Sequence, residues 1–265
     1  MFQEKNQVLW NKKIAPSYFN MGLTCNKGYS DAKPGQFITL KFSDQITPLL
    51  RRPFSIHKLI TENQIIQGIE LLYKVVGRFT EKLSVCKPGD FIDILGPLGN
   101  SFPVSEHLNQ VFIVAGGVGV APLVFLSAVL KEKGVNPLDC RLFIGGRSAD
   151  DILCKNYFLN FGMNICVTTD DGSEGEKGLV TTPLERELNI CLPDVIYACG
   201  PAPMLRAVSK IAEKYAVPCH ISVETVMACG MGACLGCAVE NRKDSGKYMH
   251  ICVDGPVFEA GLLQF

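Results

Sequence analysis

The feature that most constrains this chain is a group of three cysteines within nine residues, followed by a fourth cysteine further along. Cys229, Cys234 and Cys237 follow the spacing C-x4-C-x2-C, and Cys252 comes after fourteen intervening residues. This is the plant-type order of the four thiolate ligands of a [2Fe–2S] cluster. Glycines stand between the cysteines, and they permit the tight turns and the close backbone approach that such a loop needs.

Zinc binding and disulfide formation are the other uses of such cysteines. A structural zinc site usually takes its ligands from two separate C-x2-C pairs, and only one such pair is present here. A disulfide fits less well, because three cysteines this close together, with glycines between them, are poorly placed to bridge each other. The sequence therefore favours an iron–sulfur cluster.

The balance of charged residues limits the kinds of partner that the chain can bind. Lys and Arg together number 26, as do Asp and Glu, and no basic block occurs in the 265 residues. Nucleic acid and anionic membrane surfaces are therefore poor partners.

The first sixteen residues carry charges and lack an apolar core, so we expect no signal peptide. Of the twelve cysteines, the eight outside the motif are scattered, which indicates reduced, buried thiols and a cytoplasmic protein.

One uncharged stretch, Val111–Leu130, is long enough to span a bilayer. Gly116, Gly117, Gly119 and Pro122 interrupt it. We therefore predict a buried strand, a glycine turn and a helix in this stretch, and no membrane partner.

Residues 1–103 are predicted to form an antiparallel β-barrel domain. Short β-branched or aromatic runs alternate with turn signals such as Lys33-Pro34-Gly35, a pattern typical of small barrels. A short helix is predicted over Phe79–Val85. The predicted strands are Gln36–Phe42, Pro53–Leu59, Gln64–Val76 and Asp90–Leu95.

Residues 104–223 are predicted to form a doubly wound α/β domain with a parallel sheet, because strands and helices alternate along it. Residues 224–265 form a third, cysteine-rich module. It is too short for a core of its own, so a bound cluster would supply much of its folding energy. The predicted elements of the second domain are strands at Val111–Ala115, Arg141–Gly145, Ile165–Thr169 and Val195–Ala198, and helices at Ala121–Lys133 and Met204–Tyr215.

Two segments of the first domain have the composition of a diphosphate site. In Arg51-Arg52-Pro53-Phe54-Ser55, Arg52 would present a planar fork of donors to a diphosphate, although an exposed arginine in a strand is common. Gly77-Arg78-Phe79-Thr80 follows a strand and opens a short helix, where a hydroxyl and free N–H groups can bind an anion.

A glycine-rich turn joins the first strand and the first helix of the second domain. It runs from Gly116 to Pro122, at the place where a doubly wound sheet binds a dinucleotide diphosphate. Pro122 stands in place of the third glycine of G-x-G-x-x-G and suits a first helical turn. Taken alone, this segment is equally compatible with a plain tight turn. Three later strands also end in small polar turns, at residues 145–148, 169–173 and 199–204, which favours a ligand site at this edge.

The order of these motifs resembles that of the ferredoxin–NADP reductase superfamily. The R-P-F-S segment, the Gly77–Thr80 turn, the Gly116–Leu123 turn and Cys199-Gly200-Pro201 occur in that order. The cysteine motif and the following Asp254-Gly255-Pro256-Val257-Phe258 narrow the resemblance. Over its whole length, the chain resembles the electron-transfer subunits of type B dihydroorotate dehydrogenases.

The resemblance implies an FAD site in the first domain. Arg52 is expected on the diphosphate and Ser55 near the flavin ring, and Phe79 stands where the family usually has glycine. The implied FAD residues are Arg52, Pro53, Phe54, Ser55, Leu72, Tyr73, Lys74, Gly77, Phe79 and Thr80.

The resemblance also implies a nicotinamide-nucleotide site and a cluster site. Cys199 is expected near the nicotinamide, although a buried structural thiol is the alternative, and Ser55 and Cys199 are the candidate catalytic residues. Val226 stands where the family typically has arginine. The implied NAD(H) residues are Gly116, Gly117, Gly119, Pro122, Gly200 and Pro201, and the implied cluster ligands are Cys229, Cys234, Cys237 and Cys252.

The implied function is that of an oxidoreductase subunit, in which FAD adapts the two-electron chemistry of NAD(H) to the one-electron chemistry of the cluster. In the resembling family, the partner is an FMN-containing subunit that oxidises dihydroorotate to orotate in pyrimidine biosynthesis. NAD+ is the final acceptor there, and two subunits of each kind form a heterotetramer.

Two alternatives remain. A related subunit of the sulfide dehydrogenase or NADH-dependent ferredoxin–NADP reductase type often has an aspartate among its cluster ligands, and four cysteines favour the dihydroorotate interpretation. A non-catalytic redox sensor is disfavoured by the intact nucleotide turns.

The sequence does not distinguish NADH from NADPH, because Arg147 could bind a 2′-phosphate or face solvent, and it does not give the direction of electron flow. The four histidines are dispersed, and we interpret them as ordinary strand and loop residues.

Overall fold

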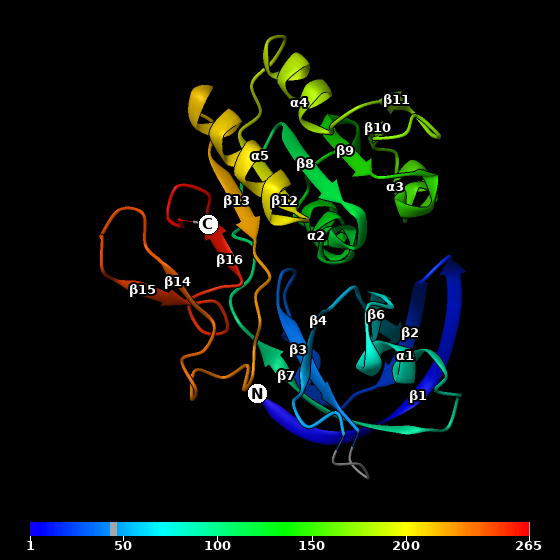
Figure 1. Cartoon of the computed structure of the whole chain (residues 1–265). Helices are drawn as coiled ribbons and strands as arrows, with labels where there is room; N and C mark the ends of the chain where they lie inside the picture. Colours follow the sequence, from blue (N-terminus) through cyan, green and yellow to red (C-terminus); the bar gives the residue numbers. More distant parts are fainter. Residues whose placement is uncertain (43–46, 265) are drawn as a thin grey trace.

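The first part of the chain folds into an antiparallel sheet of seven strands in the order β4-β3-β7-β1-β2-β6-β5. The computed structural model describes residues 1–42 and 47–264. Only Ile56 and His57 separate the two edge strands in sequence, so the sheet curls until its edges meet (Figure 1). We call residues 2–98 the barrel lobe. Its elements are β1 (Phe2–Ala15), β2 (Tyr18–Thr24), β3 (Phe37–Lys41), β4 (Arg52–Ser55), β5 (Lys58–Glu62), β6 (Ile65–Lys74), α1 (Arg78–Ser84) and β7 (Phe91–Leu98).

The prediction of one strand over Pro53–Leu59 is wrong, because the chain changes its pairing partner there. β4 pairs with β3, whereas β5 pairs with β6. At the change, the Ile56 N–H donates to the Gln36 carbonyl at 3.1 Å and the His57 N–H donates to the Glu70 carbonyl at 2.9 Å. The backbone therefore stays hydrogen-bonded while the chain passes from one edge of the sheet to the other.

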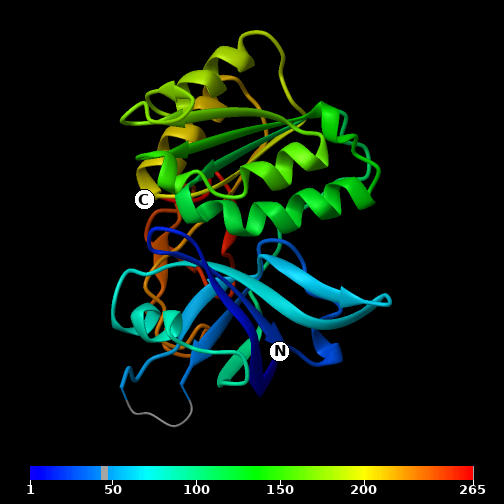
Figure 2. The ribbon, with the colours of Figure 1, turned by 90° about the vertical axis from the view of Figure 1, so that its right-hand side faces the viewer.

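Residues 111–222 form the α/β lobe, whose sheet has the order β11-β10-β9-β8-β12-β13-β16. Helices α2 and α3 cover the face toward the barrel lobe, and α4 and α5 cover the other face (Figure 2). The predicted doubly wound arrangement is confirmed. Its elements are β8 (Val111–Gly116), α2 (Val120–Glu132), β9 (Cys140–Gly146), α3 (Lys155–Phe161), β10 (Asn164–Thr169), β11 (Glu176–Lys177), α4 (Thr181–Leu188), β12 (Val195–Cys199), α5 (Ala202–Lys214) and β13 (Cys219–Ser222).

The apolar stretch Val111–Leu130 forms β8, a 3₁₀ turn at Gly117–Gly119 and most of α2, as predicted. Across the ranges 1–42 and 47–264, no helix is both long and apolar enough to cross a membrane.

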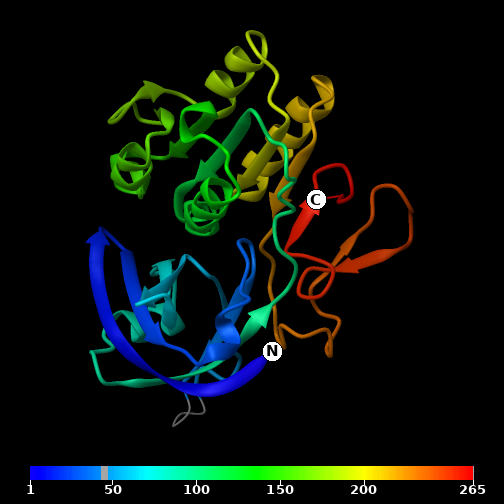
Figure 3. The same ribbon diagram turned by 180° about the vertical axis from the view of Figure 1, so that it is seen from behind.

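Residues 224–264, which we call the cysteine module, lie beside both lobes (Figure 3). The module contains a hairpin of β14 (Ala238–Glu240) and β15 (Tyr248–His250), followed by β16 (Val257–Glu259). β16 pairs with β13 in antiparallel fashion, so the otherwise parallel sheet gains an antiparallel edge strand that the sequence did not predict. Ile251 and Phe258 are buried in the same apolar core as Val208 of α5. The module is thus packed as an extension of the α/β lobe.

His57 lies in the loop between β4 and β5 and links the two lobes at a buried point, a contact that its interpretation as one of the ordinary strand and loop residues did not predict. Its side chain is buried, with Nδ1 2.9 Å from the Ala121 carbonyl of α2 and Nε2 3.6 Å from the Glu70 carboxylate. Burial lowers the pKa of His57 to about 4, aided by the Lys58 ammonium and opposed by the Ala121 carbonyl and Glu70.

We expect the free energy of unfolding to fall as the pH drops from about 6.5 through about 4. In that range the unfolded chain binds a proton at His57 that the folded chain does not bind, so acid favours unfolding. The full shift corresponds to a loss on the order of 3 kcal/mol. Urea unfolding at a series of pH values measures it. His57→Gln should flatten the dependence, and His107→Gln, at an exposed position, should leave it unchanged. An equal slope in His57→Gln would contradict this assignment.

Candidate functional site

A cavity of about 1160 Å³ opens where the barrel lobe, the α/β lobe and the cysteine module meet. Its volume exceeds the roughly 300–1,000 Å³ of ordinary small-molecule pockets, so it suits two ligands side by side. The barrel lobe contributes β4, the end of β6 and the start of α1, and the α/β lobe contributes the carboxyl ends of its strands. The cysteine module contributes Glu224, Met227 and Pro256 to the lining.

The structure brings together every residue that we predicted for FAD, for NAD(H) and for catalysis. On the barrel side, the cavity is lined by Arg52, Pro53, Phe54, Ser55, Leu72, Tyr73, Lys74, Gly77, Phe79 and Thr80. On the α/β side, it is lined by Gly116, Gly117, Gly119, Pro122, Cys199, Gly200 and Pro201.

The two neighbouring arginines at the start of β4 have different surroundings. Arg51 does not line the cavity, and its Nη2 lies 2.5 Å from the Asp93 carboxylate, with both side chains largely buried. Arg52 lines the cavity, and its Nη1 donates to the Leu50 and Arg51 carbonyls at 3.0 and 3.1 Å. The remaining guanidinium donors of Arg52 suit an anionic group in the cavity.

We expect Arg52→Ala to lower the affinity for FAD by about tenfold or more, because a charge-assisted hydrogen bond to a diphosphate is lost. The free energy of unfolding of Arg52→Ala should stay near that of the wild type. Arg51→Ala should instead lower the free energy of unfolding by about 2 kcal/mol or more, because the Asp93 carboxylate loses its cationic partner. Titration of the apoprotein with FAD and urea unfolding measure the two effects. The reverse pattern would contradict this division of roles.

The start of α1 differs in detail from the predicted anion site. The Thr80 hydroxyl accepts the N–H groups of Val76 at 2.9 Å and Gly77 at 3.1 Å, and it donates to the Gly77 carbonyl. It therefore shapes the turn instead of standing free. The Phe79 ring is buried and packs beside Phe42 and Phe54, with centroid distances of 5.1 and 6.0 Å. This aromatic packing accounts for a large side chain at a position where the resemblance implies glycine.

The glycine turn of the α/β lobe lies directly against the end of β12. A Cβ atom on Gly119 would come within 2.6 Å of the Cys199 carbonyl carbon and 2.7 Å of the Gly200 Cα. Only glycine allows the two turns to approach this closely. Burial raises the pKa of Cys199 to about 12, although a hydrogen bond with Ser222 partly offsets this. Cys199 is therefore a neutral thiol, suited to positioning a ligand and unsuited to nucleophilic attack.

Several residues that line the cavity were not predicted. Tyr18 and Asp151 lie between the lobes, Ser222 is the last residue of β13, and Val223 and Glu224 follow it. Ser222 and Glu224 could have been found, because polar residues at the carboxyl end of a short strand are the signal that identified the other turns. Tyr18 carries no such local signal. Arg147 also lines the cavity, and its side chain is 80% exposed.

The four cysteines of the motif form two pairs. The Sγ atoms of Cys237 and Cys252, both buried, lie 3.3 Å apart, and the side chains of Cys229 and Cys234 are within hydrogen-bonding reach of each other. In the parts of the chain that the structure covers, no three His, Cys, Asp or Glu side chains converge on one metal ion. Two cysteine pairs match the requirement of a cluster with two irons and four thiolates.

Backbone N–H groups point at these sulfurs, as a loop around thiolates requires. The Gly232 N–H lies 3.1 Å from the Cys252 Sγ, and Cys229 accepts from Met231 at 3.5 Å and Cys234 at 3.4 Å. Burial opposes the thiolate form of Cys229, but these N–H groups outweigh it and lower the pKa to about 7. The residues present therefore fit a cluster bound through thiolates.

The eight cysteines outside the motif are free thiols, as expected. Of the eight outside the motif, Cys140 and Cys219 are buried, whereas the other six are only partly buried. The expectation that these eight thiols are buried therefore holds fully for two of them and partly for the other six.

Comparisons with known proteins bear on the whole chain. The family model described as "Iron-sulfur cluster binding domain of dihydroorotate dehydrogenase B" matches residues 224–264, and "Oxidoreductase NAD-binding domain" matches residues 113–210. The "Dihydroorotate dehydrogenase B (NAD(+)), electron transfer subunit" of Caldanaerobacter subterraneus subsp. tengcongensis is 40% identical over 257 residues, 97% of this chain and 96% of that protein. The chain belongs to the family of dihydroorotate dehydrogenase B electron transfer subunits. A family member of the same name from Bacillus velezensis is 40% identical over 253 residues, 94% of each protein.

Solved structures of other proteins share the fold of this chain. The structure titled "Insights into flavin-based electron bifurcation via the NADH-dependent reduced ferredoxin-NADP oxidoreductase structure" has a TM-score of 0.84 and 31% identity, and the match covers 98% of this family member and 89% of that chain. The cytochrome b5 reductase domain of Ulva prolifera nitrate reductase has a TM-score of 0.66 at 18% identity, and the match covers 86% of this chain and 96% of that one. The second similarity concerns the fold alone.

Proposed function

We propose that this chain passes electrons between NAD(H) and the FMN-containing catalytic subunit of a dihydroorotate dehydrogenase. The observation that carries the proposal is the shared cavity, because one space is bounded by the predicted flavin residues, the predicted nucleotide residues and the cysteine module. Bound FAD would exchange a hydride with a nicotinamide and single electrons with a [2Fe–2S] cluster. The domains would be residues 1–103 for FAD, 104–223 for NAD(H) and 224–265 for the cluster, although residue 265 is outside the described residues.

The barrel lobe would hold FAD. Arg52 would bind the diphosphate, Ser55 would lie near the flavin ring, and the backbone of Leu72-Tyr73-Lys74 would support the cofactor. Gly77 and Thr80 would shape the turn at the diphosphate, since the Thr80 hydroxyl already fixes that turn. The aromatic packing of Phe79 would keep this wall of the cavity rigid.

The α/β lobe would hold the nicotinamide nucleotide. The turn from Gly116 to Pro122 would bind its diphosphate at the start of α2. Gly200 and Pro201 would support the nicotinamide, with the neutral thiol of Cys199 beside it. The contribution of this lobe would be to orient the nicotinamide toward the flavin and to exclude water.

The cysteine module would present the cluster to the partner. Cys234 is exposed whereas Cys237 and Cys252 are buried, so one side of the cluster would be accessible from outside. Val226, which is 84% exposed, would belong to the same surface. We propose a heterotetramer with two copies of each subunit, in the cytoplasm.

An anaerobic visible spectrum of the purified chain, recorded before and after NADH is added, tests the proposal. Flavin bands and the broad iron–sulfur absorbance should both bleach, and iron and sulfide analysis should find one [2Fe–2S] cluster per chain. Mixing with the catalytic subunit, dihydroorotate and NAD+ should then produce orotate and NADH. Flavin accompanied by zinc, without iron–sulfur colour, would contradict the proposal.

A second candidate is a flavin and iron–sulfur subunit of the NADH-dependent ferredoxin–NADP reductase type. The structural match at 31% identity over 98% of this chain favours it. That type of subunit often has an aspartate among its cluster ligands, whereas the motif of this chain supplies four cysteines, which favours the first candidate. Reduction of ferredoxin or NADP+ by NADH, with no response to dihydroorotate and its catalytic subunit, would favour the second.

A further inference from the structure

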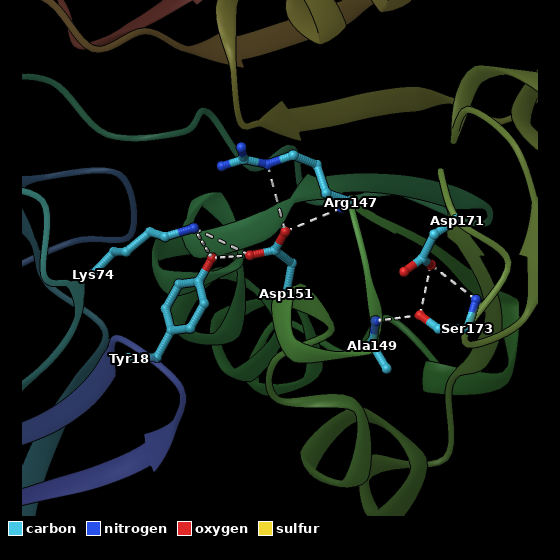
Figure 4. A network of polar contacts seen from close by, with 7 residues as sticks. All are labelled: Tyr18, Lys74, Arg147, Ala149, Asp151, Asp171 and Ser173. Carbon is cyan, nitrogen blue, oxygen red and sulfur yellow. Dashed lines mark hydrogen bonds and ion pairs between the residues drawn. The ribbon is translucent and has the colours of Figure 1, made fainter.

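A buried polar cluster joins the barrel lobe to the α/β lobe at the cavity wall (Figure 4). Tyr18, at the start of β2, pairs in register with Lys74, at the end of β6. The Lys74 Nζ donates to the Tyr18 hydroxyl at 2.8 Å and to Asp151 Oδ1 at 3.2 Å, and the Tyr18 hydroxyl donates to the same carboxylate oxygen. Asp151 belongs to the α/β lobe, in the short turn after β9. We call Tyr18, Lys74 and Asp151 the inter-lobe clamp.

The clamp is a satisfied network and not a chance surface contact. The side chains of Tyr18 and Asp151 are both buried. The second carboxylate oxygen of Asp151 accepts the Arg147 backbone N–H at 3.1 Å, and the Arg147 Nε lies 3.9 Å away. The Asp151 carboxylate therefore has donors on both oxygens and a cation from each lobe. A buried network of this kind holds one arrangement of its parts.

The clamp lies beside the nucleotide turn. Gly117 has a φ of +52°, and a Cβ atom placed on it would be 3.8 Å from the Tyr18 hydroxyl. All three clamp residues line the cavity together with Gly117. Lys74 adjoins Tyr73, which lines the flavin wall. The clamp therefore fixes the distance between the wall that would hold the flavin and the turn that would hold the nucleotide.

A second polar contact between the lobes lies at His57, which bonds to the Ala121 carbonyl in α2. This contact also connects the barrel lobe to the element that follows the nucleotide turn. Two separate points of attachment determine an angle between two bodies better than one point does. Of these two contacts between the lobes, the clamp contains an ion pair, which Lys74 and Asp151 form.

We propose that Asp151 is a positioning residue for hydride exchange, because it holds the nucleotide turn at a fixed angle to the flavin wall through Tyr18 and Lys74. The proposal rests on the proposed function. With both cofactors bound, that exchange would transfer a hydride, which carries two electrons, from C4 of the reduced nicotinamide to N5 of the flavin. The nucleotide would be oxidised and the flavin reduced. Small errors in such a geometry reduce the rate strongly without a matching loss of binding.

The test uses Asp151→Asn, which keeps the shape of the side chain and removes its charge, and Tyr18→Phe, which removes only the hydroxyl. In each variant, the rate of flavin reduction by NADH in anaerobic stopped flow should fall by about one to two orders of magnitude. The dissociation constant of NAD+, measured by calorimetry on the oxidised holoprotein, should stay unchanged. The double variant should be no slower than the slower single variant, because both changes open the same clamp.

Hydrogen exchange provides a readout that does not depend on activity. Backbone amides around residues 15–19 and 147–153 should exchange faster in both variants. Glu176→Gln is the matched control. It breaks an exposed ion pair with Arg186 in the same lobe, away from the cavity, and should change none of these quantities.

The possible outcomes test the positioning role of Asp151 separately from the proposed function. A purely electrostatic role predicts tighter NAD+ binding in Asp151→Asn and no effect in Tyr18→Phe, and that result would overturn the positioning role. Wild-type rates and exchange in both variants would overturn it as well, while leaving the proposed function in place. A wild-type protein that NADH does not reduce would overturn the proposed function, and this proposal with it.

Discussion

Cys237→Ser is expected to remove the iron–sulfur cluster while leaving the flavin reducible by NADH. Cys237 is buried with its sulfur 3.3 Å from that of Cys252, so its loss leaves one of the two cysteine pairs incomplete. Electron transfer to the partner subunit should fall by at least about 100-fold, because even residues behind the ligands affect such sites by 10- to 100-fold. Iron and sulfide analysis, the visible spectrum and NADH-dependent dye reduction measure the separate parts.

Cys191→Ser provides the control for this variant. Cys191 is a partly buried thiol that packs against the core of the α/β lobe, outside the motif. It should retain iron, sulfide and partner reduction. Retention of the full cluster by Cys237→Ser, or its equal loss in Cys191→Ser, would remove the support for the proposed ligand set.

Gly119→Ala should strongly slow the reduction of the flavin by NADH. The new methyl group would meet the backbone of Cys199 and Gly200, which cannot move without separating the nucleotide turn from the end of β12. We expect the rate to fall by about 100-fold or more, as for a misplaced reactant. The free energy of unfolding should fall by about 1–3 kcal/mol, as for other overpacked sites. Stopped flow with NADH and urea unfolding measure the two effects.

Two comparisons make this prediction specific. Dithionite should still reduce the flavin and the cluster of Gly119→Ala, because the residues proposed to hold them lie outside the altered turn. Gly261→Ala should behave as the wild type, because a Cβ atom there would meet only the end of Lys243 at 4.0 Å. Unchanged NADH reduction in Gly119→Ala would show that the close approach of the two turns is not required.

The elements predicted well from the sequence are those whose signal is local. β8 is a continuous apolar run, and the glycine turn and α2 follow it directly, so periodicity and turn chemistry were sufficient. The cysteine spacing is likewise a local pattern. The walls of the cavity contain the short motifs, in β4 and in the turns after β6, β8 and β12, that the resemblance to a known family had implied as site residues.

The elements that were missed depend on distant parts of the chain. β1 has fourteen residues, and only Asn6 and Val8 among them are buried, so its alternating pattern is too weak to indicate a strand. The break between β4 and β5 follows from the closure of the sheet, which no local pattern encodes. The contact between Tyr18 and Asp151 joins residues 133 positions apart. Such a pair is determined by how two folded lobes meet.

The pairing of β13 with β16 has a consequence for how the chain is synthesised. A ribosome completes β13 well before it adds Val257–Glu259, so the outer edge of β13 stays unpaired while the whole cysteine motif emerges. An unpaired edge strand is a template for aggregation. The nascent chain therefore passes through a stage in which one sheet edge is open and the cysteines are still unconstrained. A single event, the arrival of β16, closes that edge and anchors the segment that follows Cys252.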